Sequence, residues 1–155
     1  MKRSLIALLI FMAMTAGCSR LSPEGVNLPV FDKIYYVVFE GKPELSKGTV
    51  YYGDALEIGK ILSQQPGANN LYVAKISILN KYNDMMKDTA VFYAGDGKMM
   101  YDSVGEVGKP LTEGAKILGF TGKTGVLWFK TKSKVKSLSE AAVNKAQDLY
   151  NKAGK

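Results

Sequence analysis

The chain has 155 residues, 46% of them hydrophobic and 23% charged, with a formal net charge of +7. This composition is typical of one globular domain and excludes an intrinsically disordered chain. The absence of histidine and the single cysteine exclude serine–histidine triads, imidazole metal sites, intrachain disulfides and thiolate zinc clusters. We therefore expect a protein that is not an enzyme and that holds no cofactor or metal.

Residues 1–17 have the pattern of an export signal. Lys2 and Arg3 precede an apolar run over 5–14, and small residues then lead to Cys18. The run is shorter than the roughly 20 residues that a helix needs to span a bilayer. The pattern resembles a bacterial lipoprotein signal, which implies that Cys18 becomes the acylated first residue and carries fatty acids such as palmitate. A simple cleaved signal with an incidental cysteine is the alternative.

The next segment, 18–32, predicts a tether, because it contains prolines and glycine and lacks sustained periodicity. Residues 33–131 are strand-like, with β-branched and aromatic runs between glycine-rich turns. A phase slip at Gly59 indicates a bulge or bend. These short strands favour a mainly β fold, and we expect a small closed barrel because closure removes exposed edges. The predicted strands cover 34–39, 49–52, 55–62, 71–80, 89–93, 99–104, 115–118 and 126–131.

The C-terminal segment, 132–155, is basic and then helical. Ser137 and Glu140 match a capping box, and apolar residues recur at helical spacing over 138–152. The apolar stripe is narrow and rich in alanine. We expect this amphipathic helix to pack either on its own barrel or on a partner subunit.

Residues 45–61 resemble the opening motif of the mammalian cell entry (MCE) domain family. Looser similarities at 36–39, 87–90 and 111–119 extend the resemblance over about 33–120. It implies a small β-barrel that assembles into rings, usually hexameric. Such rings pass phospholipid or other apolar molecules together with the permease and ATPase subunits of an ABC transporter. The motif positions are filled by Leu45, Gly48, Val50, Tyr52, Gly53, Ile58, Gly59, Lys60 and Ile61.

Family members usually carry an apolar Gly-Leu-Leu-Gly loop at the centre of the ring, lining the lipid channel. The aligned stretch here has Asp96 and Lys98 where apolar residues are expected. One interpretation is a solvated hairpin turn, because Asp-Gly is a strong turn signal. The other is a channel loop whose apolar lining is Met99 and Met100. The proposed loop consists of Gly95, Asp96, Gly97, Lys98, Met99 and Met100.

Five lysines lie between Lys123 and Lys136, next to an aromatic pair. One interpretation is a surface that rests on anionic lipid headgroups. The other is a core strand followed by a soluble, lysine-rich connector. The candidate membrane-facing residues are Trp128, Phe129, Lys130, Lys132, Lys134 and Lys136.

Two functions agree with these patterns. The first is a lipid-anchored, homo-oligomeric subunit of an MCE-type ABC system for phospholipid or another apolar cargo. The second is a non-transport envelope lipoprotein whose barrel serves as a protein-interaction or scaffold module. We expect the protein to face the periplasm from the inner membrane, as the family resemblance implies, although Ser19 after Cys18 resembles lipoproteins of the outer membrane. Such a location excludes nucleic acid as a partner.

Overall fold

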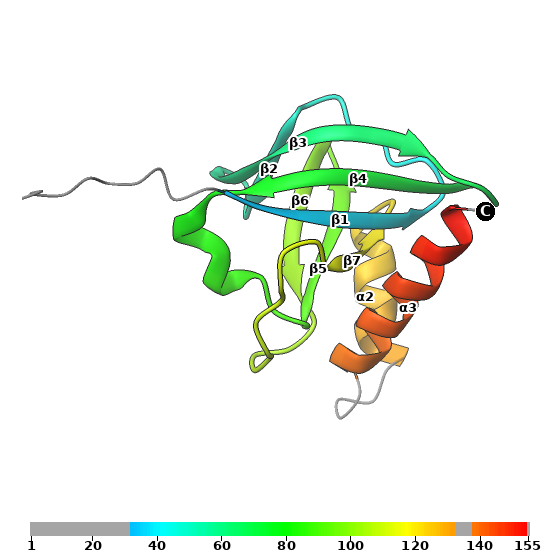
Figure 1. Cartoon of the computed structure of the whole chain (residues 1–155). Coiled ribbons are helices and arrows are strands. Elements are labelled where there is room, and N and C mark those ends of the chain that lie inside the picture. The colour runs from blue at the N-terminus through cyan, green and yellow to red at the C-terminus, as the bar shows by residue number, and fades with distance from the viewer. Residues whose placement is uncertain (1–31, 133–137, 155) are drawn as a thin grey trace, which may run out of the picture. The chain divides into compact units, whose positions relative to one another are not determined.

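The computed structural model describes residues 32–132 and 138–154 (Figure 1). The predicted export signal, Cys18 and nearly all of the tether lie outside these ranges.

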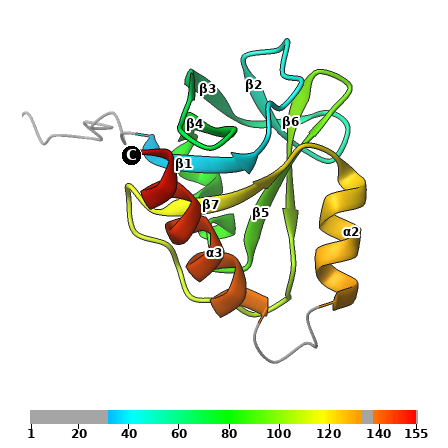
Figure 2. The ribbon, with the colours of Figure 1, turned by 90° about the vertical axis from the view of Figure 1, so that its right-hand side faces the viewer.

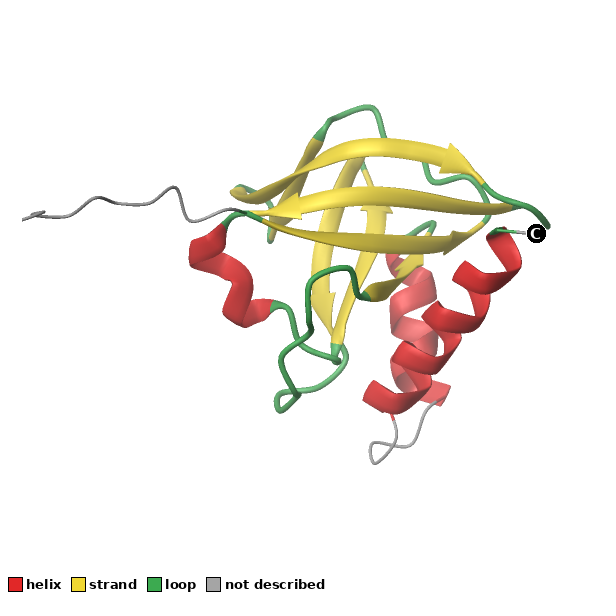
Figure 3. Cartoon of the chain, in the orientation of Figure 1, coloured by secondary structure: helices red, strands yellow, loops and turns green. Residues whose placement is uncertain are grey.

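Seven strands form one closed barrel. Their order around the barrel is β1-β4-β3-β2-β6-β5-β7, and β7 pairs with β1 to close the ring. The pairs β1–β7, β2–β6 and β5–β7 are parallel, and the others are antiparallel. The prediction of a small β-barrel with a C-terminal helix is therefore confirmed (Figure 3). The strands are β1 (Lys33–Glu40), β2 (Thr49–Tyr52), β3 (Leu56–Pro66), β4 (Leu71–Ile78), β5 (Ala90–Gly95), β6 (Lys98–Ser103) and β7 (Lys116–Phe120).

The apolar residues of β1 are divided between two cores. Tyr35, Val37 and Phe39 belong to the cluster that fills the barrel, and Val38 belongs to a second cluster outside it. This division follows from the alternation of side chains along a strand. It explains why β1 is apolar on both faces, since each face is covered.

The pairing of β3 with its neighbours is irregular at two places. The β2–β3 register shifts between Val50 and Tyr51, opposite Gly59, and the β3–β4 register shifts between Ile61 and Ser63. A Cβ atom at Gly59 would clash with the Ser77 carbonyl oxygen of β4. The irregularity predicted at Gly59 is thus present, and it bends β3 around the barrel.

Three helical segments accompany the barrel: η1 (Asn80–Met85), α2 (Lys123–Lys132) and α3 (Leu138–Ala153). The helix α3 packs on β7, β1 and β4 of its own chain, whereas α2 packs on β5 and β7 (Figure 2). The expectation that the C-terminal helix packs on its own barrel is therefore confirmed. None of the helices in the described ranges has the length and apolar character needed to cross a bilayer.

The strand predicted over 126–131 is wrong, because this segment lies in α2. Val126 and Phe129 are buried at a spacing of three residues, while Leu127 and Trp128 between them are exposed. That periodicity is helical. The last strand of the barrel ends at Phe120. The predicted boundary between the barrel domain and the C-terminal segment, at 131 and 132, therefore falls inside α2 and not at the end of the barrel.

Candidate functional site

The interior of the barrel is filled by its own side chains. Its largest fully buried members come from five strands and from the connection after η1. Packing of this kind leaves the outer surface of the barrel as the place where a ligand or partner binds. These members are Tyr35, Phe39, Phe92, Ile58, Ile76, Ile78, Met86 and Met99.

The proposed channel loop is a two-residue hairpin turn between β5 and β6. Gly95 pairs with Lys98, and the two central residues both have positive φ, 52° at Asp96 and 73° at Gly97. This is the geometry of a type I′ turn. The N–H groups of Ser46 and Lys47 donate to the Gly97 carbonyl oxygen, each at 2.9 Å. The structure therefore agrees with the interpretation of this stretch as a hairpin turn.

Met99 and Met100 are not available to line a channel at this turn. Because the turn has only two residues, both methionines lie in β6, where Met99 is 0% exposed and Met100 is 7% exposed. Met99 points into the filled barrel interior. The expectation that these side chains face apolar cargo is contradicted by their burial. Of the six proposed loop residues, Asp96 is the exposed one.

The candidate membrane-facing set does not form one surface. The helical twist of α2 turns Phe129 toward the barrel, where its ring lies 5.6 Å from that of Phe120. Trp128, in contrast, points outward, and the Lys132 Nζ atom lies 4.2 Å from its ring centroid. Lys134 and Lys136 lie outside the described residues. Among the members of the predicted set that the structure describes, Trp128 and Lys132 alone thus share an exposed face.

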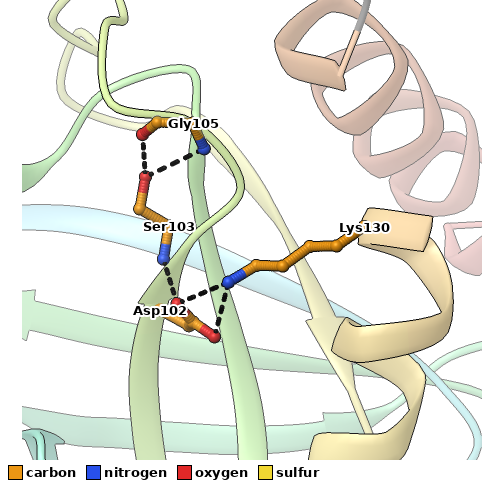
Figure 4. A network of polar contacts seen from close by, with 4 residues as sticks. All are labelled: Asp102, Ser103, Gly105 and Lys130. Carbon is orange, nitrogen blue, oxygen red and sulfur yellow. Dashed lines mark hydrogen bonds and ion pairs between the residues drawn. The ribbon is translucent and has the colours of Figure 1, made fainter. Parts of the chain in front are cut away.

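Lys130 holds α2 against the barrel. Its Nζ atom donates to both carboxylate oxygens of Asp102 at 3.0 Å, and the Ser103 N–H donates to one of them at 2.7 Å (Figure 4). The Ser103 hydroxyl then donates to the Gly105 carbonyl oxygen at 2.5 Å. This network joins α2, β6 and the turn after β6. It serves to position the helix, and Lys130 is consequently not a free surface cation.

Two tyrosine hydroxyls near this network resist ionisation. Burial raises the pKa of Tyr93, and the carboxylate of Asp102 adds to the effect. Burial also raises the pKa of Tyr101, whose hydroxyl donates to the Met85 carbonyl oxygen at 2.9 Å. The neutral, hydrogen-bonded Tyr101 thus has a structural role.

Exposed apolar side chains mark two regions, and the sequence interpretation missed the first of them. Tyr52 and Leu56 face each other across the β2–β3 pairing, and Leu127 and Trp128 lie together on α2. Alternation alone could not identify them, because their exposure depends on which elements cover each face. Leu62 and Val107 are also exposed.

Two open recesses lie beside α3. One, of about 380 Å³, is bordered by Tyr36 and Tyr150, whose rings meet edge to face at 5.8 Å. The other, of about 230 Å³, lies beside Trp128 and is bordered by the ion pair of Lys145 and Glu40, 3.0 Å apart. Within the described ranges, no group of three or more histidine, cysteine or acidic residues is placed to hold a metal ion.

No protein-family model matches this chain, and no curated protein matches it either. The similarity to the MCE family therefore stays a prediction that depends on the residues quoted for it.

Proposed function

We propose that this chain is a lipid-anchored envelope protein that passes phospholipid or another apolar molecule as the oligomeric subunit of an MCE-type ABC transport system. The observation that carries the proposal is the position of residues 45–61 in a closed seven-stranded barrel. They form the connection before β2, the whole of β2, and the turn and first half of β3.

Two of the three glycines of this motif lie where the barrel needs glycine. Gly53, in the β2–β3 turn, has a φ of +61°, and Gly59 has no space for a Cβ atom beside Ser77. A family motif that comes from a shared fold should fall on such positions, because only glycine satisfies them. The agreement supports the proposal.

The filled interior supports a mechanism that needs several copies. A single barrel has no internal space for an acyl chain, so cargo would move along surfaces between subunits. Shielding it there would avoid the penalty of roughly 25 cal/mol for each Å² of apolar area exposed to water. The exposed apolar side chains of the barrel strands are Tyr52, Leu56 and Leu62. We assign the cargo contacts to these residues in place of the buried methionines.

A second function, the scaffold or protein-interaction module, is favoured by the turn at Asp96 and Gly97. The turn is short and polar, and Ser46 and Lys47 hold it in place through the Gly97 carbonyl oxygen. It offers no apolar lining for a central channel. A lipoprotein that binds other envelope proteins through its outer surface would not need one.

Native mass spectrometry of the full lipoprotein, extracted from membranes in detergent, distinguishes the two functions. A closed ring of copies with bound phospholipid is the result expected for transport. A lipid-free monomer would reject the transport proposal and favour the scaffold. The mass also reports whether Cys18 carries acyl chains.

A further inference from the structure

The outer face of α2 is a surface on which exposed apolar and basic side chains occur together. Leu127 is 54% exposed and Trp128 is 60% exposed, although they adjoin the buried Val126 and Phe129. The residues one turn before and after them are polar or basic. The complete outer face consists of Lys123, Thr124, Leu127, Trp128, Thr131 and Lys132, all of them exposed.

Three inner contacts fix the orientation of this face. Val126 is fully buried, Phe129 packs on Phe120, and Lys130 is bound to Asp102. Rotation of α2 to bury Leu127 and Trp128 would break all three. The exposure of the two apolar side chains is therefore a consequence of how the helix is held.

The charge of the face is of one sign. Lys123 and Lys132 lie at the two ends of α2, and the sequence has no acidic residue between Glu113 and Glu140. Two carboxylates near α2 are already paired, Asp102 with Lys130 and Glu40 with Lys145. A partner with a high density of negative charge is thus complementary to this face.

The arrangement of the side chains fits a phospholipid surface. Leu127 and Trp128 are central on this face. Lys123 lies four residues before Leu127 and Lys132 lies four residues after Trp128, so each lysine is on the same side of the helix as its apolar neighbour. Indole rings favour the membrane–water interface, and lysine stems extend over apolar surface while their ammonium groups remain among the headgroups. The Lys132 Nζ atom lies 4.2 Å from the Trp128 ring centroid, so a basic group already adjoins the indole.

We propose that the outer face of α2 docks the domain directly onto an anionic phospholipid membrane, with Trp128 and Leu127 inserted at the interface. This contact is additional to any acyl anchor on Cys18 and does not depend on it. It would set the orientation of the barrel relative to the bilayer, which a tether alone cannot do.

The fragment 31–155 tests this contact without the anchor. It contains the compact unit of the structure and both buried clusters, so it keeps its own core. Trp128 is the only tryptophan of the chain, so tryptophan emission reports on this one position. The fragment is titrated with vesicles of phosphatidylglycerol and phosphatidylcholine in equal parts, and with vesicles of phosphatidylcholine alone.

We expect a blue shift of Trp128 emission, and quenching by bromines on the acyl chains, with the anionic vesicles only. Binding should weaken as salt is added. Unchanged emission in the presence of anionic vesicles would overturn the proposal. So would equal binding to both kinds of vesicle, or a blue shift that rises with protein concentration in the absence of lipid.

Variants locate the contact. Leu127→Asp keeps the reporter and should weaken binding at least tenfold, whereas Lys123→Gln and Lys132→Gln should each weaken it about fivefold. The matched controls are Lys42→Gln and Lys60→Gln, each of which removes one charge from an exposed lysine outside α2. Equal losses in the controls, or wild-type binding by Leu127→Asp, would contradict the proposal. Circular dichroism checks that each variant is folded.

Discussion

At the scale of single residues, Gly59 shows how closely the barrel strands approach each other. A Cβ atom at this position of β3 would meet the Ser77 carbonyl oxygen and the Ile78 side chain of β4. No side chain fits there, and the neighbour on one side is backbone, which cannot move away as a flexible side chain can.

We expect Gly59→Ala to lower the free energy of unfolding by about 3 kcal/mol, because β3 and β4 must separate to admit a methyl group. Urea denaturation followed by circular dichroism measures the change. Gly48→Ala is the control, since Gly48 belongs to the same sequence motif but has open space around it. A comparable loss in both variants would contradict the steric explanation.

Tyr35 has a fully buried hydroxyl for which the described residues supply no hydrogen-bond partner. We expect Tyr35→Phe to leave the free energy of unfolding unchanged or to raise it by up to about 1 kcal/mol, because it removes a buried polar atom that is not satisfied. A loss of more than 1 kcal/mol in urea denaturation would show that this hydroxyl has a partner in solution.

The buried hydroxyl of Tyr35 also makes the stability of the fold depend on pH. Burial, and to a smaller extent the Glu113 carboxylate, raises the pKa of Tyr35 above its ordinary value of 10.0. The folded state therefore keeps a proton that the unfolded state loses above pH 10. This contribution to stability is complete below pH 10 and declines as the pH rises further. Urea midpoints between pH 9 and pH 11 should fall less steeply in Tyr35→Phe, although Tyr93 and Tyr101 keep part of the slope.

At the scale of elements, α2 depends on contacts that are distant in sequence. The ion pair of Lys130 and Asp102 joins it to β6, and both side chains are about one third exposed, 33% and 31%. Water screens such a pair in part, which limits its effect on stability.

We expect Lys130→Met, which keeps the apolar stem, to lower stability by up to about 1 kcal/mol and to reduce the hydrogen-exchange protection of α2 more than that of the barrel. The control is Lys152→Met, which removes an i,i+4 pair with Asp148 on α3 whose side chains are more than half exposed. Equal loss of protection in both helices would contradict the assigned role of Lys130.

The elements also show which features the sequence could predict. In the second half of β4, one face carries Ala74, Ile76 and Ile78 and the other carries Lys75 and Ser77, so alternation identified a half-buried strand. The run Val-Leu-Trp-Phe at 126–129 has no such contrast. A short apolar run agrees with either a strand or one turn of helix, and only the packing of α2 on β5 and β7 decides between them.

The candidate site was harder to predict than the fold for the same reason. The Asp-Gly pair at 96–97 identified a turn from local conformational preference alone. The burial of Met99 and Met100, and the exposure of Tyr52 and Leu56, depend on which surfaces the rest of the chain covers. A single sequence, without tertiary contacts, does not show which side chains the rest of the chain covers.

At the scale of the whole molecule, the interior of the barrel is filled, so cargo would bind on its outer surface. The proposed transport role can be tested there. We expect Tyr52→Ser combined with Leu56→Ser to lower the amount of phospholipid that co-purifies with the full lipoprotein by severalfold. Both side chains are exposed, so the barrel should remain folded. Lipid extraction followed by mass spectrometry gives the measurement.

Val107→Ser is the matched control for this variant, because it removes an exposed apolar side chain from a loop outside the barrel strands. Unchanged lipid in the Tyr52 and Leu56 variant would exclude this hairpin as the cargo contact. An equal decrease in the control would indicate that general surface hydrophobicity, and not the hairpin, retains the lipid.

The place of β7 between β1 and β5 has a consequence for how the molecule is made. Tyr36 can meet its partner Lys116 only after nearly the whole barrel sequence exists, and Val91 likewise waits for Leu118. Until then the first and fifth strands each have an unpaired edge, and closing such distant segments is a slow step. The growing chain therefore passes through an aggregation-prone stage, in which a holding chaperone would protect two strand edges that the finished barrel conceals.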